Sequence, residues 1–279
     1  MLITGGGGML GRDVALAARD VGHEPVVLTR ADLDIRDREA VERVFIEHYP
    51  GAVVNCAAWT NVDGAEANLE EATDVNGRGA GNVAAAAAAV GAPVIYPSTD
   101  YVFDGSREEG YLESDEVGPL SAYGKSKLAG ERETAAANER HWIVRSSWLF
   151  GVNGRNFVDT MLGLAQDREE VVVVRDQIGC PTYTGHLAAG LVRLLDGEAY
   201  GVHHMAGAGR CSWHDFAVEI FSQAGLDTRV LSMTSDMLDR PAPRPAYSVL
   251  VSEREHPVLL PDWHDGLADY LAERAEVST

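Results

Sequence analysis

Lysine is the scarcest charged residue of this sequence. Only two of the 279 residues are lysine, Lys125 and Lys127, whereas 21 are arginine and 43 are aspartate or glutamate, which leaves a formal net charge of −20. Lysine normally ranks among the commonest residues of a protein. A surface this acidic repels nucleic acid and anionic lipid, so we expect neither a nucleic-acid partner nor a membrane partner.

The charge imbalance has two interpretations. Repulsion among so many carboxylates destabilises a folded chain in dilute buffer, and about 1 M salt screens it because the Debye length falls to ~3 Å. Scarce lysine together with abundant Asp, Glu and Ala favours a halophilic protein of a salty cytoplasm. An ordinary acidic enzyme is the alternative.

Cysteine and long apolar runs are also scarce. Cys56, Cys180 and Cys211 fit neither a disulfide framework nor a metal-binding spacing, so we expect small buried residues and predict no metal site. A metal at a subunit interface is left open. No apolar run approaches the ~20 residues that span a bilayer, and "MLITGGGG" at the start leaves no room for a signal peptide. These features predict a cytoplasmic location.

What the first half does contain is a regular alternation of strand and helix patterns. Continuous rather than alternating apolar strands, separated by helices, indicate a parallel sheet that is covered on both faces. We therefore predict an α/β fold with a doubly wound parallel sheet (Rossmann), forming a dinucleotide-binding domain over residues 1–150. The strand candidates are 1–4, 24–29, 51–58, 92–99 and 141–150, and the helical segments between them are 11–22, 37–50, 71–91 and 122–138.

The pattern loosens after Gly151. Residues 151–279 are expected to form mainly a second, smaller α/β domain that binds substrate, and some segments, for example around 185–207, are expected to return to the first domain. A proline-rich stretch at 240–249 predicts a loop. A final helix is expected near 263–274.

The glycine cluster "TGGGGMLG" follows the first strand and opens the first helix, which is the context of a dinucleotide-binding fingerprint. Gly6, Gly8 and Gly11 fit one spacing, G-x-G-x-x-G, and Gly5 replaces Gly6 in the alternative, G-x-x-G-x-x-G. Glycine lets the backbone approach a pyrophosphate that sits at the helix N-terminus. A tight turn without a ligand is the simpler alternative.

The end of the second strand indicates which dinucleotide is bound. An acidic residue there would bind the 2′-hydroxyl of NADH, but Arg30 stands at this point, and a guanidinium can pair with the 2′-phosphate of NADPH. NADPH is therefore favoured and NADH is left open. The expected cofactor contacts are Gly5, Gly8, Met9, Leu10, Gly11, Arg30, Asp34, Ile35, Ala57, Ala58, Tyr123 and Lys127.

The two lysines lie in "SAYGKSKLAGE". Tyr123 and Lys127 are four residues apart at the start of a helix, so both side chains lie on one face. A nearby ammonium lowers the pKa of a phenol from about 10 and makes it a better general acid. Most Y-x-x-x-K matches are surface pairs, but a chain with two lysines has kept one here. Lys125 lies on another side of the helix.

Thr99 follows the fourth strand, within "STDYVFDG". The carboxyl ends of parallel strands are where such sheets bind ligands. A hydroxyl there can hydrogen-bond a carbonyl oxygen alongside Tyr123, although it can equally cap a turn.

Together these motifs resemble the extended short-chain dehydrogenase/reductases. Within that superfamily, "NCAAWTNVDGAE", "STDYVFDG", "SAYGKSKLAGE", "RSSWLFG", "NFVDTML" and "DQIGCPTY" are similar to the dTDP-4-dehydrorhamnose reductases, and the resemblance runs from Met1 to roughly Ser248. It implies NADPH-dependent reduction of the C4 ketone of a nucleotide-linked 4-keto-6-deoxy sugar. The reaction it suggests first is dTDP-4-dehydrorhamnose to dTDP-L-rhamnose, in dTDP-rhamnose biosynthesis.

The resemblance also implies roles for particular residues. Thr99, Tyr123 and Lys127 would be the catalytic triad, and Asn156 and residues 177–182 would face the nucleotide. The implied substrate contacts are Thr60, Val62, Thr99, Val102, Phe103, Trp148 and Asn156. Several of these could instead be core or turn residues. Tyr247, where the family usually has asparagine, and Gly64, in place of a common lysine, leave the nucleotide end undecided.

Two other functions remain open. A nucleotide-sugar epimerase or dehydratase would use the same fold, although a 4,6-dehydratase usually has an acidic pair after the catalytic hydroxyl residue, whereas here Asp100 is followed by Tyr101. A non-catalytic regulatory subunit resembling the β-subunit of methionine adenosyltransferase is the other alternative. A homodimer is also compatible with the resemblance.

Overall fold

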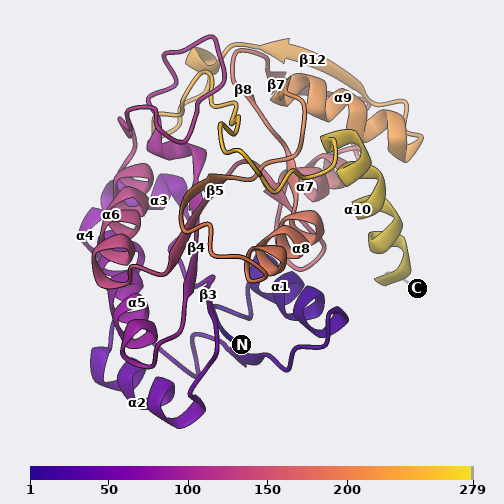
Figure 1. Ribbon diagram of the computed structural model, residues 1–279. Helices are drawn as coiled ribbons and strands as arrows, with labels where there is room; N and C mark the ends of the chain where they lie inside the picture. The colour runs from indigo at the N-terminus through magenta and orange to yellow at the C-terminus, as the bar shows by residue number, and fades with distance from the viewer. Residues whose placement is uncertain (278–279) are drawn as a thin grey trace.

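A six-stranded parallel sheet forms the centre of the computed structural model, which describes residues 1–277 (Figure 1). Each predicted strand of the first half is present, and a strand from the second half joins them at one edge. The sheet confirms the predicted α/β class. In spatial order its strands are β10 (Gly201–His204), β5 (His141–Ser146), β4 (Val94–Thr99), β3 (Val53–Asn55), β1 (Leu2–Thr4) and β2 (Val26–Leu28).

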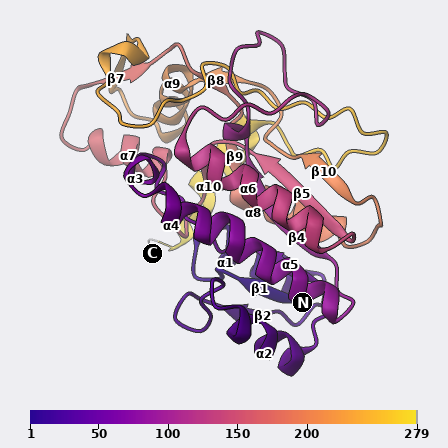
Figure 2. The ribbon, with the colours of Figure 1, turned by 90° about the vertical axis from the view of Figure 1, so that its left-hand side faces the viewer.

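Helices cover both faces of this sheet (Figures 1 and 2). On one face α1 (Met9–Asp20) packs against α8 (Thr184–Leu194), and on the other α5 (Ala80–Ala89) packs between α2 (Arg38–His48) and α6 (Ala122–Ala137). The strands are apolar on both sides because both sides are buried. The same connection order places β1 between β2 and β3, so the chain reverses direction across the sheet beside β1.

Shorter elements connect the first-half strands on the α6 side. They are α3 (Val62–Ala67), α4 (Leu69–Thr73), the π-helical η1 (Asp74–Gly79) and the 3₁₀ turn η2 (Asp100–Val102). The predicted helix over 71–91 is therefore divided into three segments, and its middle segment is wider than an α-helix.

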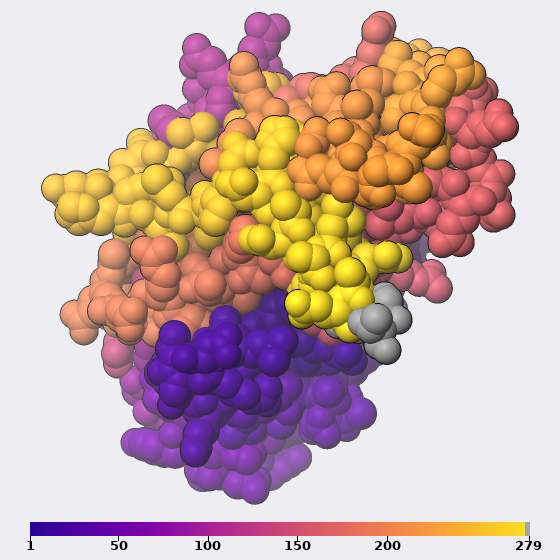
Figure 3. All heavy atoms as spheres, turned by 90° about the vertical axis from the view of Figure 1, so that its right-hand side faces the viewer, coloured from indigo at the N-terminus to yellow at the C-terminus, as the bar shows by residue number. Residues whose placement is uncertain are grey.

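A smaller lobe is built beyond the carboxyl edge of the sheet and has its own aromatic core, which includes Phe150, Phe216 and Tyr270. In it, α7 and α9 pack against each other and α9 covers a two-stranded parallel ladder of β7 and β12. Figure 3 shows α10 in yellow between α9 in orange and the indigo N-terminal segment. The elements are α7 (Phe157–Leu164), β7 (Glu170–Val174), α9 (Trp213–Ala224), β12 (Arg229–Met233), η3 (Ser235–Met237) and α10 (Trp263–Val277).

Two short ladders connect the lobe to the sheet region. β6 (Leu149–Phe150) pairs with β9 (Thr182–Tyr183), and β8 (Ile178–Gly179) pairs with β11 (Cys211–Ser212). The proline-rich stretch forms the predicted loop, and its Arg244 makes an ion pair with Asp63 of α3 at 2.9 Å. Among residues 1–277, no helix is both long enough and apolar enough to cross a membrane.

Candidate active site

The turn between β1 and α1 has room for a ligand but not for side chains. Gly5 has a φ of +64°, and a Cβ built there would lie 2.4 Å from the backbone nitrogen of Ala57. A Cβ on Gly11 would lie 2.5 Å from the carbonyl oxygen of Gly5. Gly8 is the N-cap of α1, with its backbone exposed. Gly6 is buried against Val27 instead, which favours the Gly5, Gly8 and Gly11 spacing over the one that uses Gly6.

The segment after β2 forms the outer end of the same cleft. Arg30 is exposed at its rim. Asp34 is held by Arg36, whose Nη2 donates to its carboxylate at 2.6 Å, and this pairing lowers the pKa of Asp34 to about 2. Asn82 donates to the carbonyl oxygen of Ile35 at 3.0 Å and fixes the loop. Arg30 stands near the end of β2, where a site for a 2′-hydroxyl would have an acidic residue, as expected for a site that accepts a 2′-phosphate.

A single cleft of about 1010 Å³ runs from this rim along the carboxyl edge of the sheet to the smaller lobe. It brings together most of the residues predicted from the sequence. Those that line it are Gly5, Gly8, Met9, Leu10, Gly11, Arg30, Asp34, Ile35, Ala57, Ala58, Thr60, Val62, Thr99, Tyr123, Lys127 and Trp148.

Two elements, β4 and α6, carry Thr99, Tyr123 and Lys127. Thr99 ends β4, and α6 begins at Ala122 with Ser121 as its N-cap, so Tyr123 and Lys127 lie in the first two turns. The Ser126 hydroxyl is bonded by the buried Asn76 of η1 at 2.8 Å. This bond fixes α6 against η1 and thereby sets the position of the tyrosine.

The electrostatics of Tyr123 differ from the prediction. Its pKa is raised rather than lowered, first because the phenol is shielded from solvent and second because Asp100 is nearby, while hydrogen bonding with Thr99 opposes the rise. Lys127 is not among the groups that set this pKa, and its Nζ donates to the carbonyl oxygen of Pro97 at 2.7 Å. The expectation of a lowered tyrosine pKa was therefore wrong for this state. Tyr123 remains a protonated phenol, which is the form a proton donor needs.

Lys127 is the most deeply buried of the three, with 3% of its surface exposed. Its Nζ lies 3.9 Å from the centroid of the Tyr96 ring. Burial lowers the pKa of Lys127 to about 7, although the carboxylate of Glu131 opposes this shift.

Asp100 is a site residue that the sequence analysis did not assign. It lines the cleft, and its carboxylate accepts hydrogen bonds from Thr99 Oγ1 at 3.0 Å and from Ser248 Oγ at 2.6 Å. Burial raises the pKa of Asp100 to about 6. Ser248 lies 148 residues further along the chain. Only the fold brings it here, so no local pattern could have indicated the contact.

A buried ion pair supports β4 and β5 behind the site. Arg145 of β5 binds Glu131 of α6 through Nε and Nη2 at 3.0 and 2.8 Å, and Ser98 donates to the same carboxylate at 2.5 Å. Each of the two charged side chains is 5% exposed. The pair fixes α6 to the sheet one turn beyond Lys127.

Three predicted substrate contacts are not brought to the cleft. Val102 and Phe103 are fully buried in a separate cluster with Tyr111, and the Phe103 ring stacks on Tyr111 at 4.1 Å. Asn156 is the N-cap of α7, and its side chain bonds Gly151 O at 2.9 Å. In this structure these side chains serve packing and capping, and their contact with substrate stays a prediction.

Trp213, which the sequence analysis also missed, lines the cleft beside Trp148. The two indoles are stacked, with ring centroids 3.6 Å apart and an angle of 7° between the planes. Trp148 has a φ of +49°, which is rare for a bulky residue and costs of order 1–3 kcal/mol. Strained backbone of this kind is concentrated at functional sites.

Two buried polar groups in the cleft support a bound cofactor. Asn55 Nδ2 and Ser146 Oγ are buried and have no hydrogen-bond partner among residues 1–277, and both residues line the cleft. Buried donors are normally paired. Together with the glycine turn, which a Cβ would fill, they fit a dinucleotide lying along the edge of the sheet.

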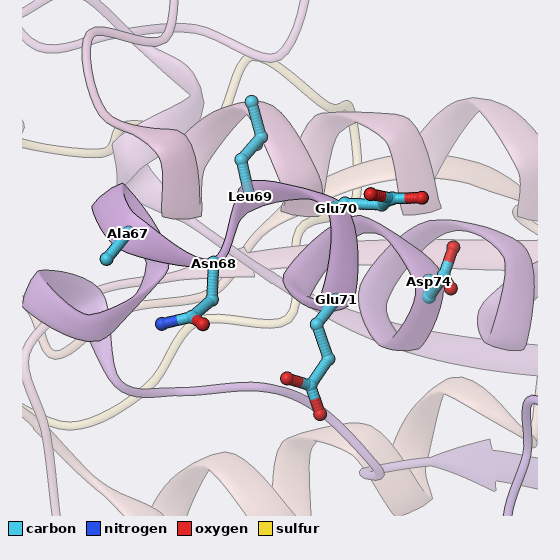
Figure 4. Close-up of a pocket in the computed structure, with 6 residues that line it drawn as sticks. All are labelled: Ala67, Asn68, Leu69, Glu70, Glu71 and Asp74. Atoms are coloured by element: carbon cyan, nitrogen blue, oxygen red, sulfur yellow. The ribbon is translucent and has the colours of Figure 1, made fainter.

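Other chemistry finds less support. Burial raises the pKa of the Cys56 thiol to about 12, so this cysteine in the cleft is not an activated nucleophile. Among the described residues, no group of three His, Cys, Asp or Glu side chains is placed to hold a metal ion. A second depression, of about 350 Å³, lies along α4, but its side chains, such as Leu69 and Glu71, point to different sides of the helix (Figure 4).

Comparison with known proteins identifies the family of the chain. The family described as "RmlD substrate binding domain" matches residues 1–276. The chain belongs to this family. Over 98% of its length it is 44% identical to a dTDP-4-dehydrorhamnose reductase of Mycolicibacterium smegmatis, 85% of which is covered. It is also 40% identical, over 99% of its length and 98% of the relative, to the spore coat polysaccharide biosynthesis protein SpsK of Bacillus subtilis.

A solved structure of the RmlD family shares the fold over nearly the whole chain. It is the dTDP-4-dehydrorhamnose reductase of Bacillus anthracis in complex with NADP, with a TM-score of 0.95, 38% identity and 98% of each chain covered. The resemblance found from the sequence motifs is therefore confirmed at the level of the family and the fold.

Proposed function

We propose that this protein is an NADPH-dependent reductase that converts dTDP-4-dehydrorhamnose to dTDP-L-rhamnose. The observation that carries the proposal is the meeting of Thr99, Tyr123 and Lys127 with the glycine turn in one cleft. The names of the Mycolicibacterium smegmatis and Bacillus anthracis relatives support the substrate, and the NADP of the latter supports the cofactor.

The cofactor would be held by groups that are already in place. The pyrophosphate fits the turn at Gly5 and Gly8, at the N-terminus of α1, and Arg30 would pair with a 2′-phosphate. Lys127, at the inner end of the cleft, would bind the ribose next to the nicotinamide. Bound NADPH supplies the hydride that reduces the ketone carbon.

Tyr123 supplies the proton. As negative charge develops on the C4 oxygen, the phenol donates its proton to that oxygen. The products are the alcohol and a tyrosinate, and solvent then reprotonates the tyrosinate. Thr99 binds the same oxygen once its hydroxyl has rotated away from Asp100, to which it donates in this structure. The ammonium form of Lys127 offsets the charge left on the phenol oxygen.

Replacing Tyr123 by phenylalanine tests these roles. General acid catalysis contributes typically 10²–10⁴-fold, so Tyr123→Phe should lose turnover of that order while it binds NADPH with unchanged affinity. The matched control is Tyr49→Phe, since Tyr49 is 72% exposed and lies outside the cleft. Turnover can be followed by NADPH absorbance and binding by NADPH fluorescence. Normal turnover by Tyr123→Phe would refute the assignment.

The alternatives predict different results. An epimerase that retains its cofactor would purify with tightly bound NAD⁺ and would not consume NADPH. A regulatory subunit would bind the cofactor, show no turnover in the wild type and co-purify with a larger enzyme. An intact Thr99, Tyr123 and Lys127 in one cleft favours the reductase over a pure binding role.

Several finer statements remain predictions. They are the division into a cofactor domain at 1–150 and a substrate domain at 151–279, the cytoplasmic location, the adaptation to salt, and a homodimer. The β10 strand and the α8 helix, both from 184–204, pack with the first half of the chain, in keeping with a domain boundary that the chain crosses more than once.

A further inference from the structure

The stacked pair of Trp148 and Trp213, here called the aromatic wall, joins the two halves of the molecule. Trp148 follows β5 of the central sheet, whereas Trp213 is the first residue of α9 in the smaller lobe. Their ring centroids are 3.6 Å apart, and their ring planes are nearly parallel. Both side chains are partly exposed, and both line the cleft.

The aromatic wall packs against the β8–β11 ladder. The indole of Trp148 lies over Gly179, where a Cβ would come within 2.5 Å of the ring. Gly179 pairs with Cys211 in the β8–β11 ladder, two residues before Trp213. The same ladder therefore positions both Gly179, on which the Trp148 ring packs, and the start of the helix that carries Trp213.

Further aromatic side chains pack around Trp213, so the surroundings of the aromatic wall are apolar. Phe157 and Phe216 stand next to Trp213, with ring centroids at 4.6 and 6.3 Å. A hydroxyl pressed against this surface would give up its bonds to water without gaining a bond from these rings. A methyl group would gain by leaving water.

The wall stands next to the reacting centre. Thr99 pairs with Ser146 across β4 and β5, and Trp148 lies two residues beyond Ser146 along the chain. A sugar whose C4 oxygen contacts Thr99 and Tyr123 therefore lies within reach of the wall. C6 is attached to C5, the ring carbon next to C4, and a 6-deoxy sugar carries there a methyl group in place of a hydroxymethyl group.

We propose that Trp213 is a specificity-determining residue, which with Trp148 forms the surface that accepts the C6 methyl of a 6-deoxy sugar and disfavours a 6-hydroxyl. This inference rests on the proposed function, because it takes the substrate to be a nucleotide-linked keto sugar. Trp213 also packs against the strained Trp148, so the loss of either indole removes part of the apolar surface that the pair presents to the cleft.

The test is a binding comparison by calorimetry with three ligands in the presence of NADP⁺. They are dTDP-L-rhamnose, dTDP-L-mannose, which differs from it only by the 6-hydroxyl, and dTDP alone. The wild type should prefer the 6-deoxy ligand by about tenfold, the size of effect that one small group has in an apolar pocket. Trp213→Ala should reduce this preference to within about twofold, since a cavity there admits the hydroxyl and its water.

Controls separate specificity from folding. Trp213→Phe keeps an apolar ring and should retain most of the preference, and His214→Ala, one residue along α9 and outside the cleft, should retain all of it. Binding of dTDP is measured in each variant as the reference for the nucleotide end, so the preference is taken as the ratio of the two sugar-nucleotide affinities within one variant.

The outcomes distinguish this inference from the proposed function. If the wild type reduces the keto sugar but Trp213→Ala keeps the tenfold preference, the inference is wrong and the reductase stands. An equal affinity of the wild type for the two sugars would also overturn the inference alone. If the wild type neither turns over nor binds either sugar nucleotide, the proposed function fails and the inference fails with it.

Discussion

Lys127 is buried where a charge is costly. Its side chain is almost wholly enclosed, its Nζ has one carbonyl partner and one ring to lie against, and its pKa falls from 10.5 to about 7. A shift of this size corresponds to about 5 kcal/mol of disfavour toward the charged form. A residue that burdens the folded state so heavily is expected at a functional site.

Lys127→Met should therefore stabilise the protein while it abolishes turnover. The pKa of Lys127 is lower in the folded than in the unfolded state, so the folded state binds fewer protons between pH 7 and 10.5 and wild-type stability rises with pH through that window. The penalty is complete below pH 7 and absent above 10.5. After the lost bond to Pro97 is allowed for, we expect a gain of about 3 kcal/mol at pH 6 that shrinks by pH 10.

Denaturant unfolding of both proteins at pH 6 and pH 10 in molar KCl provides the measurement. A methionine variant that is less stable than the wild type at pH 6, or a difference that does not change with pH, would contradict the account of Lys127.

The candidate catalytic residues could be predicted from the sequence because their pattern is local. Tyr123 and Lys127 share a helix face at any helical geometry, and Thr99 ends a recognisable strand. Phe103 could not be placed, since an apolar residue after a strand can point to the core or to the cleft. Trp213 and Ser248 join the site through contacts across the fold, for which the sequence carries no local signal.

The turn from β1 to α1 depends on glycine for two separate reasons. Gly5 combines a left-handed backbone with an approach to the backbone after β3 that excludes any Cβ. Gly22, at the end of α1, has a φ of +85° but open space around it. Alanine substitutions at Gly5 and Gly22 therefore separate the two effects, because both positions have a positive φ but only Gly5 lacks room for a Cβ.

Gly5→Ala should lower the free energy of unfolding by more than 2 kcal/mol and weaken NADPH binding by tenfold or more, since the backbone at Ala57 must move. Gly22→Ala should cost about 1 kcal/mol and leave NADPH binding unchanged. Thermal unfolding and NADPH fluorescence titration measure both effects. Equal NADPH affinity in Gly5→Ala and the wild type would show that the turn does not hold the cofactor.

Among the elements, the long first-half strands and helices were predictable and the interrupted ones were not. The apolar strand candidates correspond to β1 to β5 because runs buried on both faces have a distinct composition. The π-helical turn Asp74–Gly79 was not predicted because its sequence continues a helical pattern, and its Asn76 bonds to Trp59 and Ser126, which are distant in the sequence. The two-residue strands of the lobe are likewise set by tertiary contacts.

The molecule as a whole carries 43 acidic and 23 basic side chains, and most of its ion pairs are at the surface. Exposed pairs contribute little to stability. Repulsion among the remaining carboxylates acts over the whole surface and is weakened as salt shortens the Debye length.

We expect the midpoint of thermal unfolding to rise by about 5 °C or more between 0.1 and 2 M KCl, which corresponds to a stabilisation of about 2 kcal/mol for a chain of this size. Sucrose at matched osmolality should give a smaller rise because it does not screen charge. A midpoint that is flat or falls with KCl would favour the ordinary acidic enzyme over adaptation to salt.

The parallel sheet could be predicted from the sequence, and segments around 185–207 were expected to return to the first domain, but the position of the sixth strand in the sheet could not be predicted. β10 comes from the second half and joins the sheet beside β5, where each paired residue is 59 positions from its partner. Nothing in the composition of Gly201–His204 distinguishes it from a strand of the smaller lobe.

The most direct test of the account is the stoichiometry of NADPH oxidation with dTDP-4-dehydrorhamnose generated in situ, in molar KCl, for the wild type and Tyr123→Phe. The account predicts that the wild type oxidises NADPH in an amount equal to the keto sugar consumed and forms dTDP-L-rhamnose, while Tyr123→Phe binds NADPH but turns over at least about 10²-fold more slowly. A folded wild type that binds NADPH without oxidising it, or a Tyr123→Phe variant as fast as the wild type, would contradict it.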